Sequence, residues 1–519
     1  MATSIRWQMP GPLSADEARI ARDLHRVGKF YVFLREVRHE LFDEAFQAEL
    51  ATAYQPRGTA PVPPALLAMV LLLQAYDQVG DADAVVTARM DLRWQLVLGC
   101  LGAEQAPFSQ GVLVAFRERL IAHDLDRRLV DRTVALAKTR GGFGWQALRA
   151  ALDSSPLLGA GRVEDTWNLV GRALQTVATC AAATLRISRA AVLRDAGVTL
   201  LGAPSLKAAL DIDWTDPTAQ AEALARLLAD VDRLEAWVAT HVPVAEVPPV
   251  QAALAALRRV LAQDLEPDPT TGQRRIRRGV AADRMPSLGD PEMRHGRKTR
   301  TKPFNGYKRH VLTLIDQQLI VDAIVRPANE PEHTALAQLE PALVPHGRLV
   351  ELAVDRGYLA SPRIGPLHAQ GVAIRAKAWR SRNGERFPKH AFAIDLVARR
   401  VTCPAGHVAT IAPGAAAVHF RPTVCQPCAQ RDACTTARAR SVSLHPQEAL
   451  LQTLAAAQRH PEGRAALRER VVVEHTLGRI GHIQGPRARY KGVRKNTLDM
   501  RRTAAVANLQ RVARLPAAA

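Results

Sequence analysis

The sequence predicts a mixed α/β sheet covered by helices, joined to an all-α N-terminal domain and interrupted by a helical insertion and a small cysteine-rich insertion. Three observations predict this fold class. Residues 1–140 carry apolar side chains at helical intervals, whereas 349–354 is a mostly apolar run typical of a strand buried on both faces. Two β-rich runs, about 307–315 and 319–326, flank a polar turn and predict a β-hairpin.

The predicted elements divide the chain into six segments, because the two insertions separate pieces of one sheet. We expect a helical N-terminal domain at 1–140, the first part of the α/β domain at 141–165, a helical insertion with a basic linker at 166–285, a second α/β part at 286–395, a cysteine-rich insertion at 396–445, and the C-terminal helices of the α/β domain at 446–519.

Composition indicates a polyanionic partner. The chain has 70 Lys and Arg against 50 Asp and Glu, a net charge of +20 and a pI of about 10.4, which favours binding to phosphate backbones. The longest apolar run, 65–73, is too short to span a bilayer, and the N-terminus lacks the order of a signal peptide. We therefore expect a soluble, cytoplasmic protein.

In the N-terminal segment, Ser14 and Ser109 are predicted helix caps. The helix after Ser109 carries Arg117 and Arg119. Two short helices joined by a tight loop could form a helix-turn-helix that recognises DNA, and a packed helical bundle with solvated arginines explains the same pattern.

Three acidic residues are candidates for a shared site. Asp355 directly follows the run 349–354, Asp153 ends another short apolar run, and Glu474 lies with Arg470 on one face of a predicted helix. Three carboxylates together repel one another unless a cation neutralises them, and hard oxygen ligands suit Mg²⁺ or Mn²⁺. Each acid also has a structural explanation: a turn cap for Asp153, and ion pairs with nearby basic residues for Asp355 and Glu474.

Four cysteines cluster in the second insertion. Cys403 precedes Cys425, Cys428 and Cys434, and Cys425 and Cys428 form a C-x₂-C pair. This pattern predicts a tetrahedral structural Zn²⁺ site, with free or redox-active thiols and a disulfide pair as the alternatives. Cys100 and Cys180 stand in apolar helical contexts and are predicted to be small core residues.

Upstream, the stretch 274–302 is dense in Arg and Lys. In a chain of net charge +20 it predicts a loop that tracks phosphates, with a solvated loop as the alternative.

Several strings, taken together and in this order, resemble the DDE transposases of bacterial insertion sequences. They are LDSSPLLGAGRVEDT, DPEMRHGRKTRTKPFNGYKRHV, VRPANEPEH, VDRGY and VVVEHTLGRIGHIQGPRARYKG, and the similarity covers nearly the whole chain. Most similar is the subgroup with an InsH-like N-terminal domain and a catalytic domain of ribonuclease H-like type.

The resemblance implies that Asp153, Asp355 and Glu474 form a catalytic triad holding two Mg²⁺ (or Mn²⁺) ions roughly 3.5–4 Å apart. It implies DNA cleavage at insertion-sequence ends and strand transfer into target DNA. The spacings 355 − 153 = 202 and 474 − 355 = 119 leave room for the two insertions. Leu467 and Gly481 replace a tyrosine and a lysine that related transposases often carry.

The implied partners are double-stranded DNA, as terminal inverted repeats and as target, and a second copy of the chain in a synaptic homodimer at the bacterial nucleoid. Candidate phosphate contacts are Lys302, Lys308, His310, Arg356, Arg470 and His475, each with a structural salt bridge as the alternative. Two other functions remain open: a non-catalytic DNA-binding regulatory zinc protein, and a metal-dependent nuclease without strand transfer.

Overall fold

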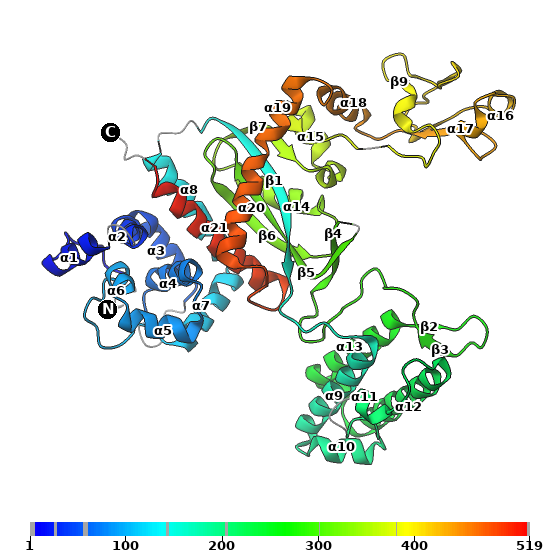
Figure 1. Ribbon diagram of the computed structural model, residues 1–519. Coiled ribbons are helices and arrows are strands. Elements are labelled where there is room, and N and C mark those ends of the chain that lie inside the picture. The colour runs from blue at the N-terminus through cyan, green and yellow to red at the C-terminus, as the bar shows by residue number, and fades with distance from the viewer. Residues whose placement is uncertain are drawn as a thin grey trace.

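The computed structural model describes residues 6–24, 28–54, 61–141, 145–202, 206–299, 301–379 and 381–515. Figure 1 shows a central sheet with the N-terminal helices on one side and two outlying parts on the other. One outlying part is helical and follows β1; the other follows β8 and contains four of the six cysteines. The sheet therefore combines strands that the first insertion separates in the sequence.

The N-terminal part is entirely helical in its described residues. Its helices are α1 (Ala15–Asp23), α2 (Lys29–Leu41), α3 (Glu44–Ala51), α4 (Pro64–Asp77), α5 (Asp81–Met90), α6 (Leu92–Leu98), α7 (Gln110–Ala122) and α8 (Leu125–Arg140). Ser14 and Ser109 cap α1 and α7 as predicted, because their hydroxyls accept hydrogen bonds from the backbone N–H groups of Glu17 and Val112.

Helix α7 packs into this bundle rather than presenting its arginines to solvent. Arg117 is buried, and its guanidinium forms an ion pair with Asp81. Arg119 lies over the ring of Tyr54, 4.5 Å from its centroid. The structure thus favours the packed bundle over a DNA-reading helix, and the expectation that Arg117 is solvated was wrong because Asp81 provides a buried partner.

The central sheet is mixed, as predicted. Its strands are β1 (Ala147–Leu158), β4 (Arg294–Thr299), β5 (Lys302–Leu314), β6 (Ile320–Pro327), β7 (Arg348–Val354) and β8 (Ala373–Arg375), in the order β4-β5-β1-β7-β8, with β6 also pairing β5. Strand β5 runs antiparallel to β1 and β6, whereas β7 and β8 run parallel to β1. The predicted hairpin is β5–β6.

Strand β1 is longer than its sequence indicates. Asp153 was expected at the strand's end, but β1 continues to Leu158 because β5 pairs with it over 150–158. Strand β7 pairs β1 only as far as Leu152. Pro156 therefore lies where β1 is an edge strand on the β7 side, a position that tolerates proline.

Helices cover both faces of the sheet. On one face lie α14 (Thr334–Leu339), η2 (Glu340–Leu343), α15 (Ile364–Ala369) and α18 (Glu448–Ala457); on the other lie α20 (Val471–Gln484) and α21 (Val493–Val512). Leu152 and Leu352 pack toward the first face with Leu336. Ala151 and Ala353 pack toward the second face against Val473 of α20, which lies across β1 and β5 (Figure 1).

The first insertion has its own apolar core. It contains α9 (Thr166–Leu185), α10 (Arg189–Asp195), α11 (Leu206–Leu210), α12 (Pro217–His241), η1 (Val244–Glu246), α13 (Pro248–Asp264), β2 (Leu265–Pro267) and β3 (Arg274–Ile276). The expected basic loop is in part regular structure, because Arg274 and Arg275 lie in β3. Arg275 pairs with Glu266 and Asp268, so its charge is already neutralised.

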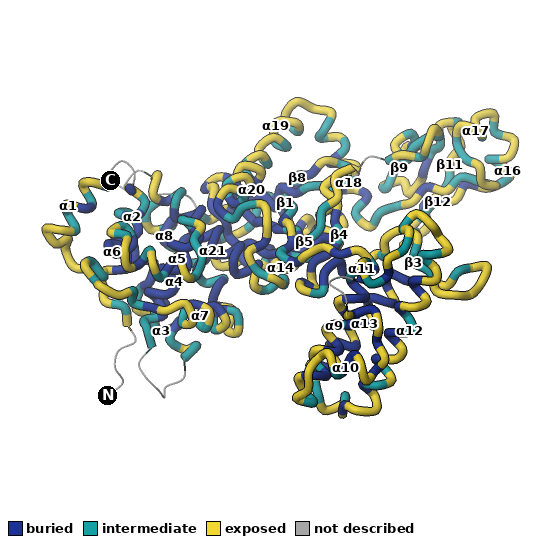
Figure 2. Tube along the Cα trace, turned by 60° about the horizontal axis from the view of Figure 1, so that its bottom comes forward, coloured by how far each residue is buried: buried dark blue, intermediate teal, exposed yellow. Residues whose placement is uncertain are grey.

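The second insertion consists of short strands and turns. After η3 (Arg356–Ala360) and β8 come η4 (Lys389–Ala391), β9 (Ala393–Asp395), β10 (Arg400–Thr402), β11 (Val408–Thr410), β12 (Ala417–His419), α16 (Pro422–Cys425), α17 (Arg431–Cys434) and β13 (Ser441–Ser443). Helix α19 (Pro461–Glu469) then leads into α20 and has no buried residue, so it stands out as exposed in Figure 2.

Among the described residues, no single helix has the length and apolar composition needed to cross a membrane. One bent pair, Thr166–Leu185 with Arg189–Asp195, meets the criterion by length and composition alone.

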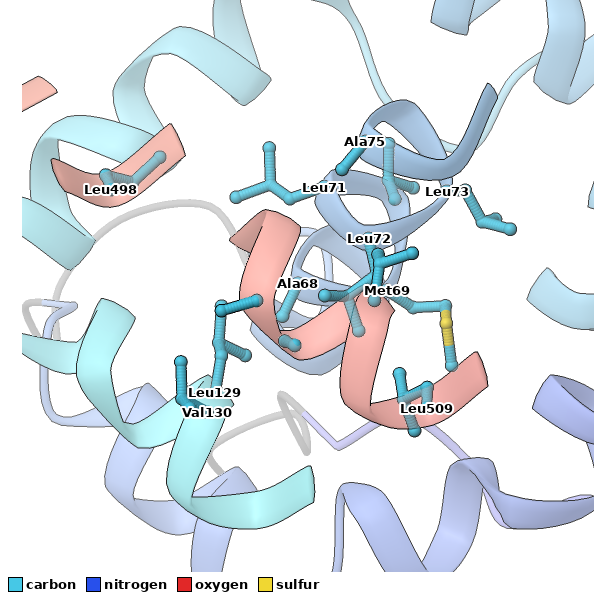
Figure 3. Packing of buried hydrophobic residues seen from close by; sticks show 14 of the residues in the cluster. Ala68, Met69, Leu71, Leu72, Leu73, Ala75, Leu129, Val130, Leu498 and Leu509 are labelled. Carbon is cyan, nitrogen blue, oxygen red and sulfur yellow. The ribbon is translucent and has the colours of Figure 1, made fainter. Parts of the chain in front are cut away.

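Helix α21 links the sheet to the N-terminal helices. Leu498 and Leu509 pack beside side chains of α4 and α8 (Figure 3). Arg501, which is buried, pairs with Asp322 of β6 at 3.1 Å and with Asp126 of α8 at 3.3 Å. This ion cluster ties three parts of the chain together.

Replacing Arg501 by methionine should lower the free energy of unfolding by about 3–5 kcal/mol, because it leaves buried carboxylates without their partner. Urea denaturation would measure the change. Arg400→Met is the control, since its pair with Asp395 is exposed and should contribute less than about 1 kcal/mol. Equal effects of the two substitutions would contradict the structural role of the cluster.

Candidate active site

Strands β1 and β7 bring Asp153 and Asp355 together. Leu152 of β1 pairs with Val354 of β7 in the parallel register. Asp153 and Asp355 directly follow these two paired residues. Side chains alternate along a strand, which places both aspartates on the face that carries Ala151 and Ala353. Both carboxylates therefore face α20.

Glu474 reaches the same region from the first turn of α20. Arg470 Nη1 donates to Asp153 Oδ2 at 2.8 Å, and Arg470 Nη2 donates to Glu474 Oε1 at 3.0 Å. One guanidinium thus bridges two of the three predicted acids. The structure brings the triad into one neighbourhood, with Arg470 between Asp153 and Glu474.

Asp153 is the most perturbed of these acids. Its side chain is 16% exposed, and burial raises its pKa to about 6. The charge of Arg470 and a hydrogen bond from the Ser154 backbone N–H lower that pKa, whereas the carboxylates of Asp355 and Glu332 raise it. Burial thus outweighs the charge of Arg470 in setting the pKa of Asp153.

Glu332 was not among the predicted site residues. Ser154 Oγ donates to Glu332 Oε1 at 2.7 Å, which places this carboxylate beside the β1 segment that carries Asp153. The only sequence signal was its position within the string VRPANEPEH, upstream of β7.

His310 is a structural residue and not a phosphate contact, contrary to expectation. It is 1% exposed and shares a 2.7 Å hydrogen bond with the hydroxyl of Tyr358. Burial, assisted by the charges of Lys308 and Arg326, lowers the His310 pKa to about 3, so the ring is neutral. Lys308 also has a hydrogen-bond partner within the fold, because its ammonium donates to the Glu330 carbonyl at 2.9 Å.

The other predicted DNA contacts lie in different surroundings. Arg356 and Arg470 line a cleft that opens beside Asp355 and Glu474. His475 is exposed on α20, and Lys302 is exposed at the start of β5.

This cleft has a predominantly basic lining. Its charged side chains are Arg356, Lys377, Arg382, Arg459, Arg464, Arg468 and Arg470, with the acids Asp355 and Glu474. Trp379 also lines it; this indole is 40% exposed and donates to the Arg356 carbonyl at 3.1 Å. A cleft of this charge fits a phosphate backbone next to the acids.

In the part of the chain that the structure describes, no group of three or more His, Cys, Asp or Glu side chains is arranged to hold a metal ion as it stands. The chemistry of the three acids nevertheless fits a hard divalent cation, because Asp153, Asp355 and Glu474 offer carboxylate oxygens from one neighbourhood of the fold. Arg470 would have to release its two carboxylates for a cation to enter.

The four cysteines of the second insertion gather at one cavity. Cys403, Cys425, Cys428 and Cys434 all line it, together with His407. All four thiols are free, and burial together with the other three thiols raises the pKa of Cys434. Cys100 and Cys180 are half-buried elsewhere and pack against the apolar cores, as predicted.

The neutral state of His310 should make the fold sensitive to acid. Its folded-state pKa lies below the ordinary value of 6.5, so the unfolded chain takes up a proton that the folded chain cannot, and stability falls as pH drops from about 6.5 toward 3. Urea denaturation at about pH 7 and about pH 4.5 should show wild type losing roughly 3 kcal/mol more than His310→Gln, at 1.36 kcal/mol per pH unit. Equal losses would show that the ring is not buried neutral.

Comparison with known proteins gives two matches. Residues 402–513 match the family model of a transposase DDE domain, a range that contains Glu474. Residues 22–119 match the model of a transposase domain, DUF772, which covers most of the N-terminal helices. No curated protein and no solved structure matches the chain. Both matched models are transposase domains, and together they support a DDE transposase of insertion-sequence type.

Proposed function

We propose that this transposase cleaves DNA at the ends of an insertion sequence and joins the cut strand to target DNA, with Asp153, Asp355 and Glu474 as its catalytic carboxylates. One observation carries the proposal: the two aspartates are adjacent on parallel strands, and Arg470 connects Asp153 to Glu474 at the edge of a basic cleft.

The topology supports a ribonuclease H-like core. In chain order, and leaving out the short β4, the strands of the sheet are β1, β5, β6, β7 and β8, and their spatial order is β6-β5-β1-β7-β8. The second strand is antiparallel to the first and the fourth is parallel to it. This arrangement places the end of the fourth strand beside the middle of the first, where the proposed catalytic aspartates lie.

The triad would hold two Mg²⁺ or Mn²⁺ ions. When bound, such ions activate a water or a 3′-hydroxyl and stabilise the leaving oxygen of an in-line attack on phosphorus. Burial is the largest cause of the raised pKa of Asp153, and a cation bound there would stabilise the ionised carboxylate.

The basic cleft would bind the phosphate backbone and orient the scissile bond. Arg356 follows Asp355 directly, and Arg470 already stands among the acids. We propose that Arg470 exchanges its carboxylate partners for a phosphate when DNA binds. The exchange would free the carboxylates to bind a cation and would neutralise the charge of that phosphate. Since two DNA ends must be held for strand transfer, the proposed active form is a homodimer.

Asp355→Asn should reduce Mg²⁺-dependent cleavage of terminal-repeat DNA by at least about a hundredfold, because it removes a cation ligand, and leave binding within about threefold. Cleavage and gel-shift assays would measure both. Asp232→Asn is the matched control, as Asp232 is exposed on α12 in the first insertion. Undiminished cleavage by Asp355→Asn would remove the triad from the mechanism.

The same assay separates the alternatives. Wild type that binds but does not cut would favour a DNA-binding regulatory protein. A pre-cut end with a free 3′-hydroxyl, mixed with target plasmid, should give joined products; hydrolysis without joining would favour a nuclease.

We also propose that the four clustered cysteines hold a structural Zn²⁺. Their thiols line one cavity in the second insertion, and soft thiolates close a tetrahedral zinc site. Elemental analysis should find one zinc per chain in wild type and strongly reduced zinc in Cys428→Ser. Cys180→Ser, which alters a cysteine on α9, should keep the metal. Zinc-free wild type in which all four clustered thiols react would refute the site.

A further inference from the structure

Glu332 lies in the turn between β6 and α14, and its carboxylate reaches the end of β7. Its Oε1 accepts the Ser154 hydroxyl at 2.7 Å. Its Oε2 lies against Gly357, two residues after Asp355, so closely that a Cβ on Gly357 would collide with it. One carboxylate therefore touches both segments that carry the proposed catalytic aspartates.

The end of β7 explains how this contact arises. Asp153 faces α20, whereas Ser154, as the next residue on the strand, faces α14. Strand β7 pairs β1 only to Leu152, so beyond that point side chains from the α14 face can approach Asp153.

Glu332 has no cationic partner among the described residues. Its neighbour Glu330 pairs with Arg326, and Arg470 is shared by Asp153 and Glu474. Glu332 is half-buried, and it contacts the residue after Asp153 and the turn that follows Asp355. A partly desolvated carboxylate among other carboxylates is unfavourable unless a cation joins them.

We propose that Glu332 is a fourth acidic residue of the active site and binds a divalent cation together with Asp153 and Asp355. The inference rests on the proposed function, because it assumes that the aspartates bind divalent cations. Ser154 then acts as a positioning residue, since its hydroxyl holds Oε1 and leaves Oε2 toward the Asp355 turn.

The test is Mn²⁺ binding by the full chain without DNA, measured by calorimetry. Glu332→Gln keeps the shape and the hydrogen-bonding atoms but removes the charge, and we expect it to weaken Mn²⁺ binding at least about tenfold. Its thermal midpoint without metal should stay within about 3 °C of wild type, at a few degrees per kcal/mol. Glu330→Gln is the matched control, because it lies in the same turn with its own arginine partner, and it should bind as wild type does.

Two further variants keep the inference falsifiable if Glu332→Gln does not fold. Glu332→Asp retains the charge on a shorter side chain and should bind Mn²⁺ with intermediate affinity. Ser154→Ala removes only the positioning hydroxyl and should weaken binding less than Glu332→Gln. Equal losses in Ser154→Ala and Glu332→Gln would overturn direct ligation, and so would wild-type affinity in Glu332→Gln or in Glu332→Asp.

Asp355→Asn separates this inference from the proposed function. If wild type cleaves DNA and Asp355→Asn loses Mn²⁺ affinity while Glu332→Gln does not, the role of Glu332 fails and the function stands. If Mn²⁺ affinity depends on both residues but wild type does not cleave terminal-repeat DNA, the cation site stands and the function fails.

Discussion

The parallel pairing of β1 with β7 is the interaction on which the site depends. A shift of one residue would turn either aspartate to the opposite face of the sheet, away from α20. The register is fixed by apolar packing, because Leu152 and Val354 are buried in the core beneath α14 and α18. The positions of Asp153 and Asp355 therefore follow from the hydrophobic pattern of the strands. The packing of β1 and β7 thus sets where the two carboxylates lie.

Glu474 depends on a different set of contacts. Val473, Leu477 and Ile480 bury one side of α20, which leaves the opposite side with Glu474 exposed toward the cleft. Helix α20 in turn contacts α21, whose Arg501 cluster joins the sheet to α8. The N-terminal helices thus support α20 through α21, and Arg117 of α7 forms a buried ion pair within them.

Sequence patterns were reliable where the signal is local. The β5–β6 hairpin, the strand before Asp355 and the Ser14 and Ser109 caps were all predicted and observed. The predicted exposure of polar residues in strand β5 was wrong, because the burial of a residue there depends on paired strands that are remote in the sequence. Since β5 lies between β1 and β6 with helices on both faces, His310 is buried whatever its polarity. A basic residue inside a central strand is a poor candidate for a DNA contact.

Glu332 is a site candidate that the sequence alone could not identify. In the sequence it is one acid in a polar turn, indistinguishable from Glu330, and only the fold separates them. Glu330 turns toward Arg326, whereas Glu332 turns toward Ser154 and Gly357. The absence of a side chain at Gly357 is what admits the carboxylate to the Asp355 turn. These acids come from the middle of β1, the end of β7, a helix and this turn, and Arg470 supplies positive charge between two of them. If the acids bind a cation as proposed, that cation would have to displace Arg470.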